Sequence, residues 1–436
     1  MKRSLTVQCI VGLLLGILVG TLLSRLQPQA VDGWLAGADL AIRGWTNALR
    51  LVVTPLVVSQ LFVAISPHRA SKGDAAALGL GIPVVFFGLL VFTMLCALTI
   101  TAALLATPLL QQVSFPSLDA ARAGLQAAGA ATQSGAGGWL DDVIPPNLIA
   151  AAARPEAILG LMLFTLAFAL AARRLAQEQQ QVLVAGAQAV RDTMFVLIGW
   201  LLRLAPLLIF ALALRFTVGS GLAVGQLLLW YIAVELTVLL CCTAALYPLT
   251  VLGGGVSLGR FARAAFPGQV TAAASRSSLA TVPVLMREAD ARLGIPAKIS
   301  ALVIPLGGAT LKLSRAVSSP VKLLFIAHFL GLSLSPGQLL VFCLTIILLS
   351  PSTPGVPSMV SGARSMPAFV AVGVSPEYVI LFGATTAVLD VLLTVLNATG
   401  YLSAAALVSR LLSFRTARAG AATPALADDA GRGPAG

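Results

Sequence analysis

Two cationic side chains stand in the middle of a long apolar stretch of this sequence. Lys312 and Arg315 lie in PLGGATLKLSRAV, residues 305–317, inside an apolar region that runs from 295 to 334. A charged side chain at the centre of a membrane helix costs about 2.5 kcal/mol or more even on the most lenient insertion scale. These residues therefore predict either a function or a structural partner that offsets this cost.

Acidic and polar side chains occur in other apolar stretches. Asp390, Thr394 and Asn397 are spaced i, i+4 and i+7, which places them on one face of a helix. An acid at membrane depth is a candidate functional residue, although it can also be the partner of a buried cation. Glu235, in LLLWYIAVELTVLL, is the candidate for proton coupling, because a desolvated Glu can carry a proton in the physiological range. Its alternative role is again a structural one.

Two further titratable residues lie near the far end of the stretch that carries Lys312. His328, in FIAHFLG, is interpreted as a packed polar residue or a titrating group. Lys322 is expected to extend its side chain along apolar surface toward water.

Composition places the chain in a membrane. The 436 residues are 58% hydrophobic and 10% charged, whereas soluble proteins carry about a quarter charged residues. The net charge of +12 is spread between apolar runs, which favours basic cytoplasmic loops over a nucleic-acid surface. None of the five cysteines has CxxC spacing, and phosphate-loop, HExxH and GxSxG motifs are absent from the sequence. The sequence predicts no catalytic residue, metal or cofactor.

The apolar runs predict a polytopic all-α protein with lipid around it. The N-terminal run is longer than that of a signal peptide and is interpreted as a first span. Further spans are expected at 37–66, 75–108, 143–172, 187–216 and 222–252. Alternate loops carry the basic residues, which predicts that both termini are cytoplasmic. Residues 109–142 are expected to form an outer loop, and residues 414–436 a disordered tail.

Two later stretches are interrupted in ways that a membrane helix does not tolerate. TAAASRSSLATVP interrupts the first, 258–292, and SPSTPGVPSMVSG interrupts the second, 337–374. Non-helical backbone at membrane depth occurs only where it is buried in protein or lines a cavity. Paired interruptions indicate the binding site of a transporter, so each stretch is predicted to be a re-entrant helical hairpin. Between them we expect a helix broken near Gly307 and Gly308.

This organisation resembles the dicarboxylate/amino acid:cation symporter family, which has the glutamate-transporter fold. The matching strings cover nearly the whole chain in order: RLVVTPLVVS (50–59), VIPPNLIAAAA with GLMLFTLAFAL (143–170), APLLIFAL (205–212), SRSSLATVPV (275–284), PLGGAT with FIAHFLG (305–331), PGVPS (354–358) and LDVLLTVLNATG (389–400).

The resemblance implies eight transmembrane helices, two re-entrant hairpins, a homotrimer and a transport half that slides against a scaffold half. The expected divisions are 1–74 (scaffold helices 1–2), 75–108 (transport-domain helix 3), 109–142 (outer loop), 143–220 (scaffold helices 4–5), 221–413 (transport domain: helix 6, hairpin 1, broken helix 7, hairpin 2 and helix 8) and 414–436 (cytoplasmic tail). It also implies the cell (inner) membrane as location.

The resemblance further implies roles for individual residues. Asp390 would take the amino group of the solute, and Asn397 its main carboxylate. Ser277 and Ser278 would offer hydroxyls and free backbone N–H groups to an anion, as helix N-termini do. Val356 falls where the tip of the second hairpin covers the solute.

Departures from the family pattern concern the sodium sites. Where the family carries an Asn-Met-Asp-Gly-Thr string, this chain has Leu311 to Arg315, LKLSR. At a second sodium site, Tyr401 stands where the family has an acid. Leu311 and Leu313 stand where the string has its amide and its carboxylate, and leucine cannot coordinate a hard cation. Lys312, Arg315 and Ser319 are spaced i, i+3 and i+7, so we hypothesise that fixed cations replace bound sodium. The alternative is that both cations reach water or pair structurally.

Arg315 has a second candidate role. The family has an Arg that binds a distal carboxylate of the solute, and this chain has Leu393 at that position. Arg315 could supply the guanidinium from the broken helix. Arg276, at the tip of the first hairpin, is a third cation of the same region. Together these cations favour an anionic solute.

The sequence therefore predicts a secondary active transporter, of symporter type with an elevator mechanism, for an acidic amino acid or dicarboxylate. Sodium coupling is expected to be lost, which leaves proton coupling or exchange. The alternative function is an anion channel or uncoupled leak on the same fold. An intramembrane enzyme has no support, because the sequence shows no nucleophile–base pair.

Overall fold

A computed structural model describes residues 5–26, 31–65, 75–111, 147–149, 158–220, 223–350 and 358–421. Helices account for the secondary structure of these residues, and no strand occurs among them. Their bounds are α1 (Leu5–Leu26), α2 (Val31–Ile65), α3 (Ala75–Leu105), α4 (Pro108–Gln111), α8 (Ile158–Ala172), α9 (Gln177–Arg203), α10 (Ala205–Ser220), α11 (Ala223–Gly254), α12 (Leu258–Ser275), α13 (Val282–Leu293), α14 (Ala297–Thr310), α15 (Leu313–Leu330), α16 (Pro336–Leu349), α17 (Ser358–Ala371), α18 (Pro376–Gly383) and α19 (Thr386–Ala421).

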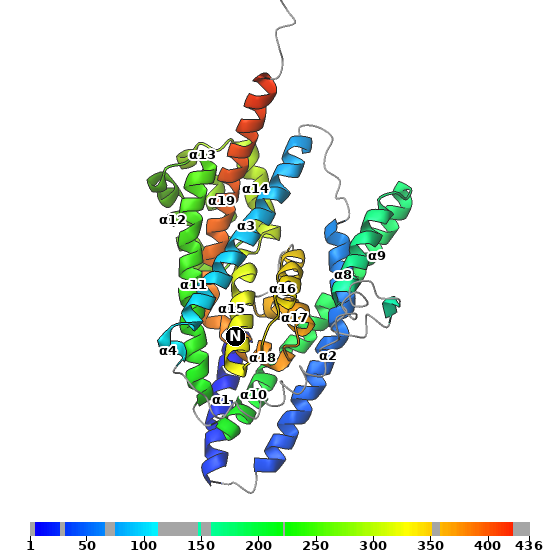
Figure 1. Ribbon diagram of the computed structural model, residues 1–436, viewed down its shortest axis with the longest axis vertical. Coiled ribbons are helices and arrows are strands. Elements are labelled where there is room, and N and C mark those ends of the chain that lie inside the picture. The colour runs from blue at the N-terminus through cyan, green and yellow to red at the C-terminus, as the bar shows by residue number, and fades with distance from the viewer. Residues whose placement is uncertain are drawn as a thin grey trace, which may run out of the picture.

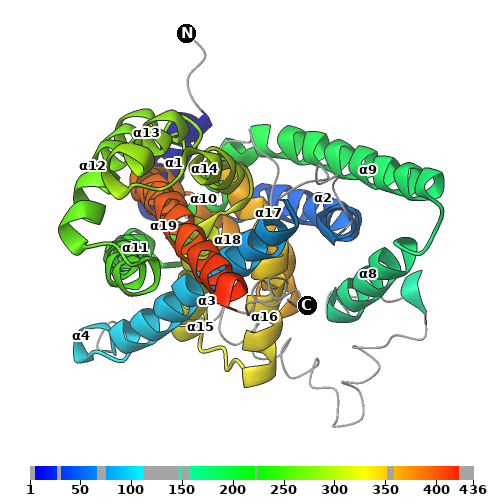
Figure 2. The same ribbon diagram turned by 90° about the horizontal axis from the view of Figure 1, so that it is seen from above.

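The helices form two packing groups. Helices α3, α11, α14 and α15 pack around α19, and the pair α12–α13 lies against the same helix (Figures 1 and 2). In the second group, α1 packs along α10, and α2 contacts α8, α9 and α10. Helices α16, α17 and α18 touch members of both groups. The all-helical class predicted from sequence is confirmed.

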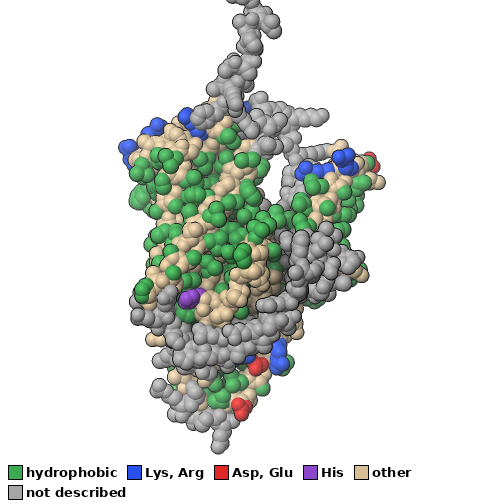
Figure 3. Space-filling model, viewed as in Figure 1, with side chains coloured by type: hydrophobic (Ala, Val, Ile, Leu, Met, Phe, Trp, Pro, Cys, Tyr) green, Lys and Arg blue, Asp and Glu red, His purple; other side chains and the backbone are tan. Residues whose placement is uncertain are grey.

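Among the residues that the structure describes, five helical segments are long and apolar enough to cross a membrane. They are Gly81–Leu105, Gln177–Leu201, Gly225–Gly254, Ala297–Leu330 and Val388–Ser413. Hydrophobic side chains cover much of the middle of the face shown in Figure 3. Lys and Arg side chains gather mainly at its upper end, and a few acidic and basic side chains lie toward its lower end. An apolar belt with charged ends is the surface that a bilayer requires.

The predicted span 187–216 is two helices, α9 and α10, that meet at Leu204. Pro206 has no backbone N–H, so the helical hydrogen bond to the carbonyl four residues earlier cannot form. Near this position a backbone hydrogen bond spans three residues in place of four, with Leu204 N donating to Leu201 O at 3.1 Å. Proline therefore produces a kink inside one continuous segment.

Three predicted interruptions are present. Helices α12 and α13 pack side by side, as do α16 and α17. The break between α14 and α15 falls at Leu311 and Lys312, after the glycines near which it was predicted. Gly307 and Gly308 lie inside α14. A Cβ at Gly307 would come within 3.1 Å of Tyr401, and one at Gly308 within 3.1 Å of Val282. They permit close packing.

Two boundaries differ from expectation. α19 continues to Ala421, so residues 414–421 are helical and do not belong to a disordered tail. Helix α4 occupies the start of the expected outer loop. The rest of that loop, residues 112–142, and the tail 422–436 lie outside the described residues.

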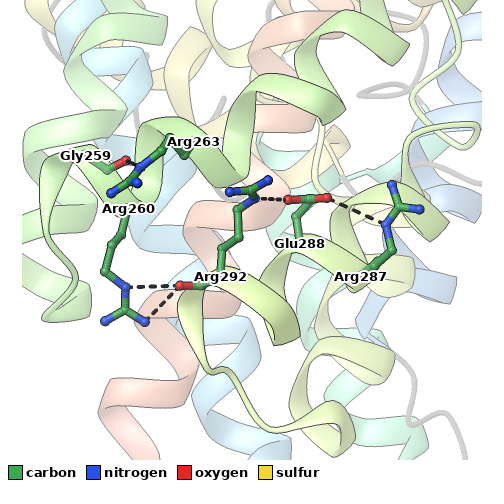
Figure 4. Close-up of polar contacts among 6 residues, drawn as sticks. All are labelled: Gly259, Arg260, Arg263, Arg287, Glu288 and Arg292. Atoms are coloured by element: carbon green, nitrogen blue, oxygen red, sulfur yellow. Dashed lines mark hydrogen bonds and ion pairs between the residues drawn. The ribbon is translucent and has the colours of Figure 1, made fainter.

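The two arms of the first hairpin are joined at their base. Arg260 of α12 donates to the carbonyl of Arg292 in α13 at 2.8 and 3.1 Å (Figure 4). Glu288 accepts from Arg292 at 2.5 Å, one turn away. Both arginines are well exposed, so these contacts fix orientation and contribute little stability.

Candidate solute-binding site

The break between α14 and α15 is closed by side chains. At the end of α14 the Gly308 carbonyl accepts a hydrogen bond from Lys312 Nζ at 2.7 Å. At the start of α15 the Ser314 N–H donates to Asn397 Oδ1 at 3.0 Å. Helix ends leave carbonyl and N–H groups without intrahelical partners. A lysine and an asparagine supply those partners here.

Lys312 is directed toward α19. Its Nζ lies 3.4 Å from the Tyr401 hydroxyl and 5.9 Å from the centroid of the Tyr401 ring, so a cation–π contact adds to the hydrogen bond. The Tyr401 hydroxyl is also within hydrogen-bonding reach of Ser278 in the first hairpin. Lys312 takes extended backbone angles, φ −111° and ψ 77°, and is not in a helix. The predicted helical face shared with Arg315 and Ser319 is therefore wrong for Lys312.

Arg315 reaches the second hairpin. Its Nη1 donates to the carbonyl of Leu349, the last residue of α16, at 2.7 Å, and only 4% of the residue is exposed. Carbonyls at a helix C-terminus carry partial negative charge, which a guanidinium stabilises. Val356, the predicted tip residue of this hairpin, lies outside the described residues. Ser319, one turn beyond Arg315, donates to Ser365 of α17 at 3.1 Å. The start of α15 is thus joined to both arms of the hairpin.

Asp390, Thr394 and Asn397 all lie on α19, in the helical register that their spacing predicts. The Thr394 hydroxyl donates to the backbone carbonyl of Asp390 at 2.8 Å. The Asn397 side chain makes a reciprocal pair with Ser314, since its Nδ2 donates to Ser314 Oγ at 2.9 Å. Thr394 and Asn397 are buried, and Asp390 is half-buried.

The tip of the first hairpin carries Arg276, Ser277 and Ser278. Arg276 ends α12 in the left-handed conformation, with φ 51°, and is exposed. The Ser277 N–H donates to Ser275 Oγ at 3.2 Å. The prediction that this backbone N–H is free is therefore wrong. Ser277 and Ser278 are half-buried.

Glu235 belongs to a second polar cluster. It is 1% exposed, accepts a hydrogen bond from Ser318 of α15, and lies close enough to Lys322 for the two charges to attract. Lys322 is 4% exposed, so the prediction that it extends toward water is wrong. Because Lys322 is buried between apolar helices, its ammonium group interacts with the carboxylate of Glu235 in place of water. Two isolated charges of opposite sign in neighbouring spans were the sequence signal for this pair.

The remaining departures from the family pattern are packed as apolar core. Leu311, Leu313 and Leu393 are all buried, and Leu313 lies against Gly400, where a Cβ would come within 2.2 Å of it. Tyr401 is fully buried. His328, by contrast, is exposed near the end of α15.

Broken helices that converge on α19, with buried polar side chains at the breaks, define the class of protein: a polytopic helical membrane carrier. The model of the sodium:dicarboxylate symporter family matches residues 5–411, and this chain belongs to that family. It is therefore a secondary transporter and not an enzyme.

The chain is similar to several characterised carriers. It is 27% identical to the proton/glutamate-aspartate symporter of Escherichia coli, with 92% of this chain and 91% of the relative covered. It is 23% identical to the proton/sodium-glutamate symport protein of Bacillus caldotenax, with 94% of each covered. Identity to the C4-dicarboxylate transport protein of Deinococcus radiodurans is 25%, over 81% of this chain and 77% of the relative.

Proposed function

We propose that this protein transports a small anionic solute, an acidic amino acid or dicarboxylate, without bound sodium. The observation that carries the proposal is the placement of two fixed cations on backbone carbonyls at helix ends, Lys312 on Gly308 and Arg315 on Leu349. Inward-facing carbonyl oxygens are ligands for a hard cation. An ammonium and a guanidinium supply positive charge there without an ion.

The solute would bind among these cations and the residues on α19. In this proposal Asp390 takes an amino group and Asn397 exchanges its Ser314 partner for a carboxylate. Arg276, Ser277, Ser278 and Val356 contribute from the hairpin tips, and Thr394 lines the α19 face. Arg315 supplies the guanidinium that Leu393 cannot.

We place the carrier in the inner membrane, with both termini cytoplasmic, as a homotrimer. The two packing groups of helices support a transport half, residues 75–108 and 221–413, that moves as an elevator against a scaffold half. The scaffold would comprise residues 1–74 and 143–220. The basic residues at the base of the first hairpin (Figure 4) support a cytoplasmic position for that end.

Thermal unfolding of the purified protein tests the proposal. A ligand that binds only the folded state stabilises it by about 2.7 kcal/mol at 100 times its dissociation constant. We expect L-aspartate, L-glutamate or succinate to raise the melting temperature equally in sodium and choline chloride. Stabilisation of the solute-free protein by sodium would overturn the assignment of Lys312 and Arg315. The absence of stabilisation by any of the three solutes would overturn the assignment of substrate class.

Counterflow in proteoliposomes separates a carrier from a channel. A carrier accumulates labelled solute against unlabelled internal solute and saturates. A channel gives neither result. We expect saturable counterflow with the solute that stabilises the protein best.

A further inference from the structure

The base of the first hairpin carries exposed arginines that the proposed solute site does not use. Arg260 and Arg263 lie in the first two turns of α12, and Arg292 lies in the last turn of α13 (Figure 4). Arg410 of α19 reaches the turn that precedes α12, because a Cβ on Gly255 would lie 3.2 Å from its Nε. Guanidinium groups from three helices therefore gather where α12 begins.

Acidic side chains balance only part of this charge. Glu288 accepts a hydrogen bond from Arg292 at 2.5 Å, and its other oxygen lies 3.6 Å from the Nε of Arg287. Between Leu258 and Lys298, without the tip residue Arg276 and together with Arg410, the charged residues are Arg260, Arg263, Arg287, Arg292, Lys298 and Arg410, with the acids Glu288 and Asp290. Six cations and two acids leave this basic cluster with a net charge of +4.

The exposed face of α12 changes from basic to apolar along its length. Arg263, Phe266 and Val270 are spaced i, i+3 and i+7, so they lie on one side of the helix. Phe266 is 65% exposed and Val270 is 50% exposed. The opposite side of α12, which includes the buried Phe261 and Ala265, packs against the bundle. A cation is thus followed by two exposed apolar side chains over about 10 Å of helix.

This order of side chains matches the order of groups in a phospholipid. A free phosphate ion needs cations and no apolar surface beside them, whereas a lipid phosphate is continued by acyl chains. The Nε of Arg263 donates to the Gly259 carbonyl at 3.0 Å, which holds the guanidinium at the start of the helix (Figure 4). A guanidinium can bind a phosphate group through two parallel N–H groups. Charge and apolar surface together therefore favour an anionic lipid.

We propose that the base of the first hairpin binds an anionic phospholipid, with its phosphate at Arg260, Arg263 and Arg410 and an acyl chain along Phe266 and Val270. The site is separate from the proposed solute site, and the proposal does not depend on which solute is carried. An arginine near an anionic membrane surface contributes about fivefold in affinity. We therefore expect selection of anionic over zwitterionic lipid at this position.

Photolabelling of the full chain in nanodiscs tests the site. One sample contains phosphatidylglycerol with a diazirine on an acyl chain, and the other contains the matching phosphatidylcholine. After illumination, the labelled peptides are mapped by mass spectrometry. We expect the peptide with Phe266 and Val270 to be labelled at least about fivefold more by phosphatidylglycerol. Equal labelling by the two lipids would overturn the proposal. The absence of labelling by either lipid would show that protein covers this face, and would overturn it as well.

Matched arginine variants locate the headgroup. The Nε of Arg263 and that of Arg43 each donate to the carbonyl four residues earlier, at 3.0 and 3.3 Å. We expect Arg263→Gln to lower phosphatidylglycerol labelling of this peptide about fivefold, and Arg43→Gln to leave it unchanged. Gel filtration checks that both variants fold. Unchanged labelling in a folded Arg263→Gln variant would contradict the site.

A competition experiment separates a lipid from a free anion. Sodium phosphate replaces sodium chloride at the same ionic strength during photolabelling. We expect phosphatidylglycerol labelling to be unchanged, because phosphate lacks the acyl chain that contacts Phe266 and Val270. Loss of labelling in phosphate would show that the basic cluster binds a free anion, and would overturn the lipid assignment. None of these outcomes affects counterflow, so the proposed function stands or falls separately.

Discussion

Lys312 and Arg315 are held by backbone oxygens. Each donates to a carbonyl at the C-terminal end of a helix, Gly308 in α14 and Leu349 in α16. Two charges about 4 Å apart attract by about 4 kcal/mol at an effective dielectric of 20, so an acid could also have offset the insertion cost. Helix C-termini offer the same kind of compensation, because their carbonyls carry partial negative charge and need donors.

Arg315 should be required for transport. Arg315→Met removes both charge and donor, and Arg315→Lys keeps the charge. Since a hydrogen bond to a charged group contributes about 1.5–3 kcal/mol, we expect the Met variant to lose L-aspartate counterflow by about tenfold or more. The Lys variant should retain part of it. Hydrogen exchange in residues 336–349 should rise in the Met variant, and unchanged exchange with unchanged counterflow would refute this role.

The pair of Ser314 and Asn397 should stabilise the break between α14 and α15. Asn397→Ala removes both hydrogen bonds, whereas Ser314→Ala removes only the bond from Asn397 Nδ2. A neutral hydrogen bond contributes about 1 kcal/mol and an unsatisfied buried group costs about 1–3 kcal/mol. The melting temperature should therefore fall more for Asn397→Ala than for Ser314→Ala. The reverse order would show that the N–H of Ser314 does not need this partner.

At the scale of elements, small residues decide how closely helices approach. α1 packs along α10 through Gly12, Gly16 and Gly20, a small-xxx-small pattern. A Cβ on Gly12 would lie 2.5 Å from the carbonyl oxygen of Pro206, and one on Gly16 at 2.5 Å from that of Phe210. Backbone cannot move aside as a side chain can, so these glycines fix the distance between the two helices.

Alanine at these glycines should separate α1 from α10. Overpacking typically costs 1–3 kcal/mol, so Gly12→Ala and Gly16→Ala should lower the melting temperature of the detergent-purified protein. Gly186→Ala in α9 is the control, because a Cβ there meets nothing within 4 Å and Ala favours the helix by about 1 kcal/mol. Equal melting temperatures for all three variants would contradict this packing.

At the scale of the whole molecule, two of the charge clusters among the helices around α19 have different partners. One joins the breaks around Lys312 and Arg315 to both hairpins. The other, Glu235 with Lys322 and Ser318, links α11 to α15 away from those breaks. This separation allows solute binding and proton binding to be altered independently.

Glu235→Gln should remove the effect of a proton gradient and retain exchange. In vesicles preloaded with L-aspartate, an inward proton gradient should drive succinate uptake by the wild-type protein. The variant has no titrating carboxyl at this position, so uptake of succinate should no longer depend on the gradient. L-Aspartate binding, measured by thermal shift, is the control for folding. Full proton dependence in Glu235→Gln would exclude this residue as the proton carrier.

The sequence by itself determined the helical membrane class, the two interrupted stretches and the shared face of Asp390, Thr394 and Asn397. Hydrophobic run length, proline and glycine positions and helical spacing are local properties, so they can be read along the chain. The break between α14 and α15 was displaced from its predicted place because the glycines there serve close packing and not the break.

Only the tertiary structure decided which groups satisfy the buried charges. The partners of Lys312, Arg315 and Asn397 come from residues 34 to 89 positions away or from a helix end whose position the sequence does not reveal. Lys322 was expected at a water interface, yet Glu235 lies near it on a neighbouring helix. A buried charge must find a partner wherever packing brings one, and that choice is a property of the fold.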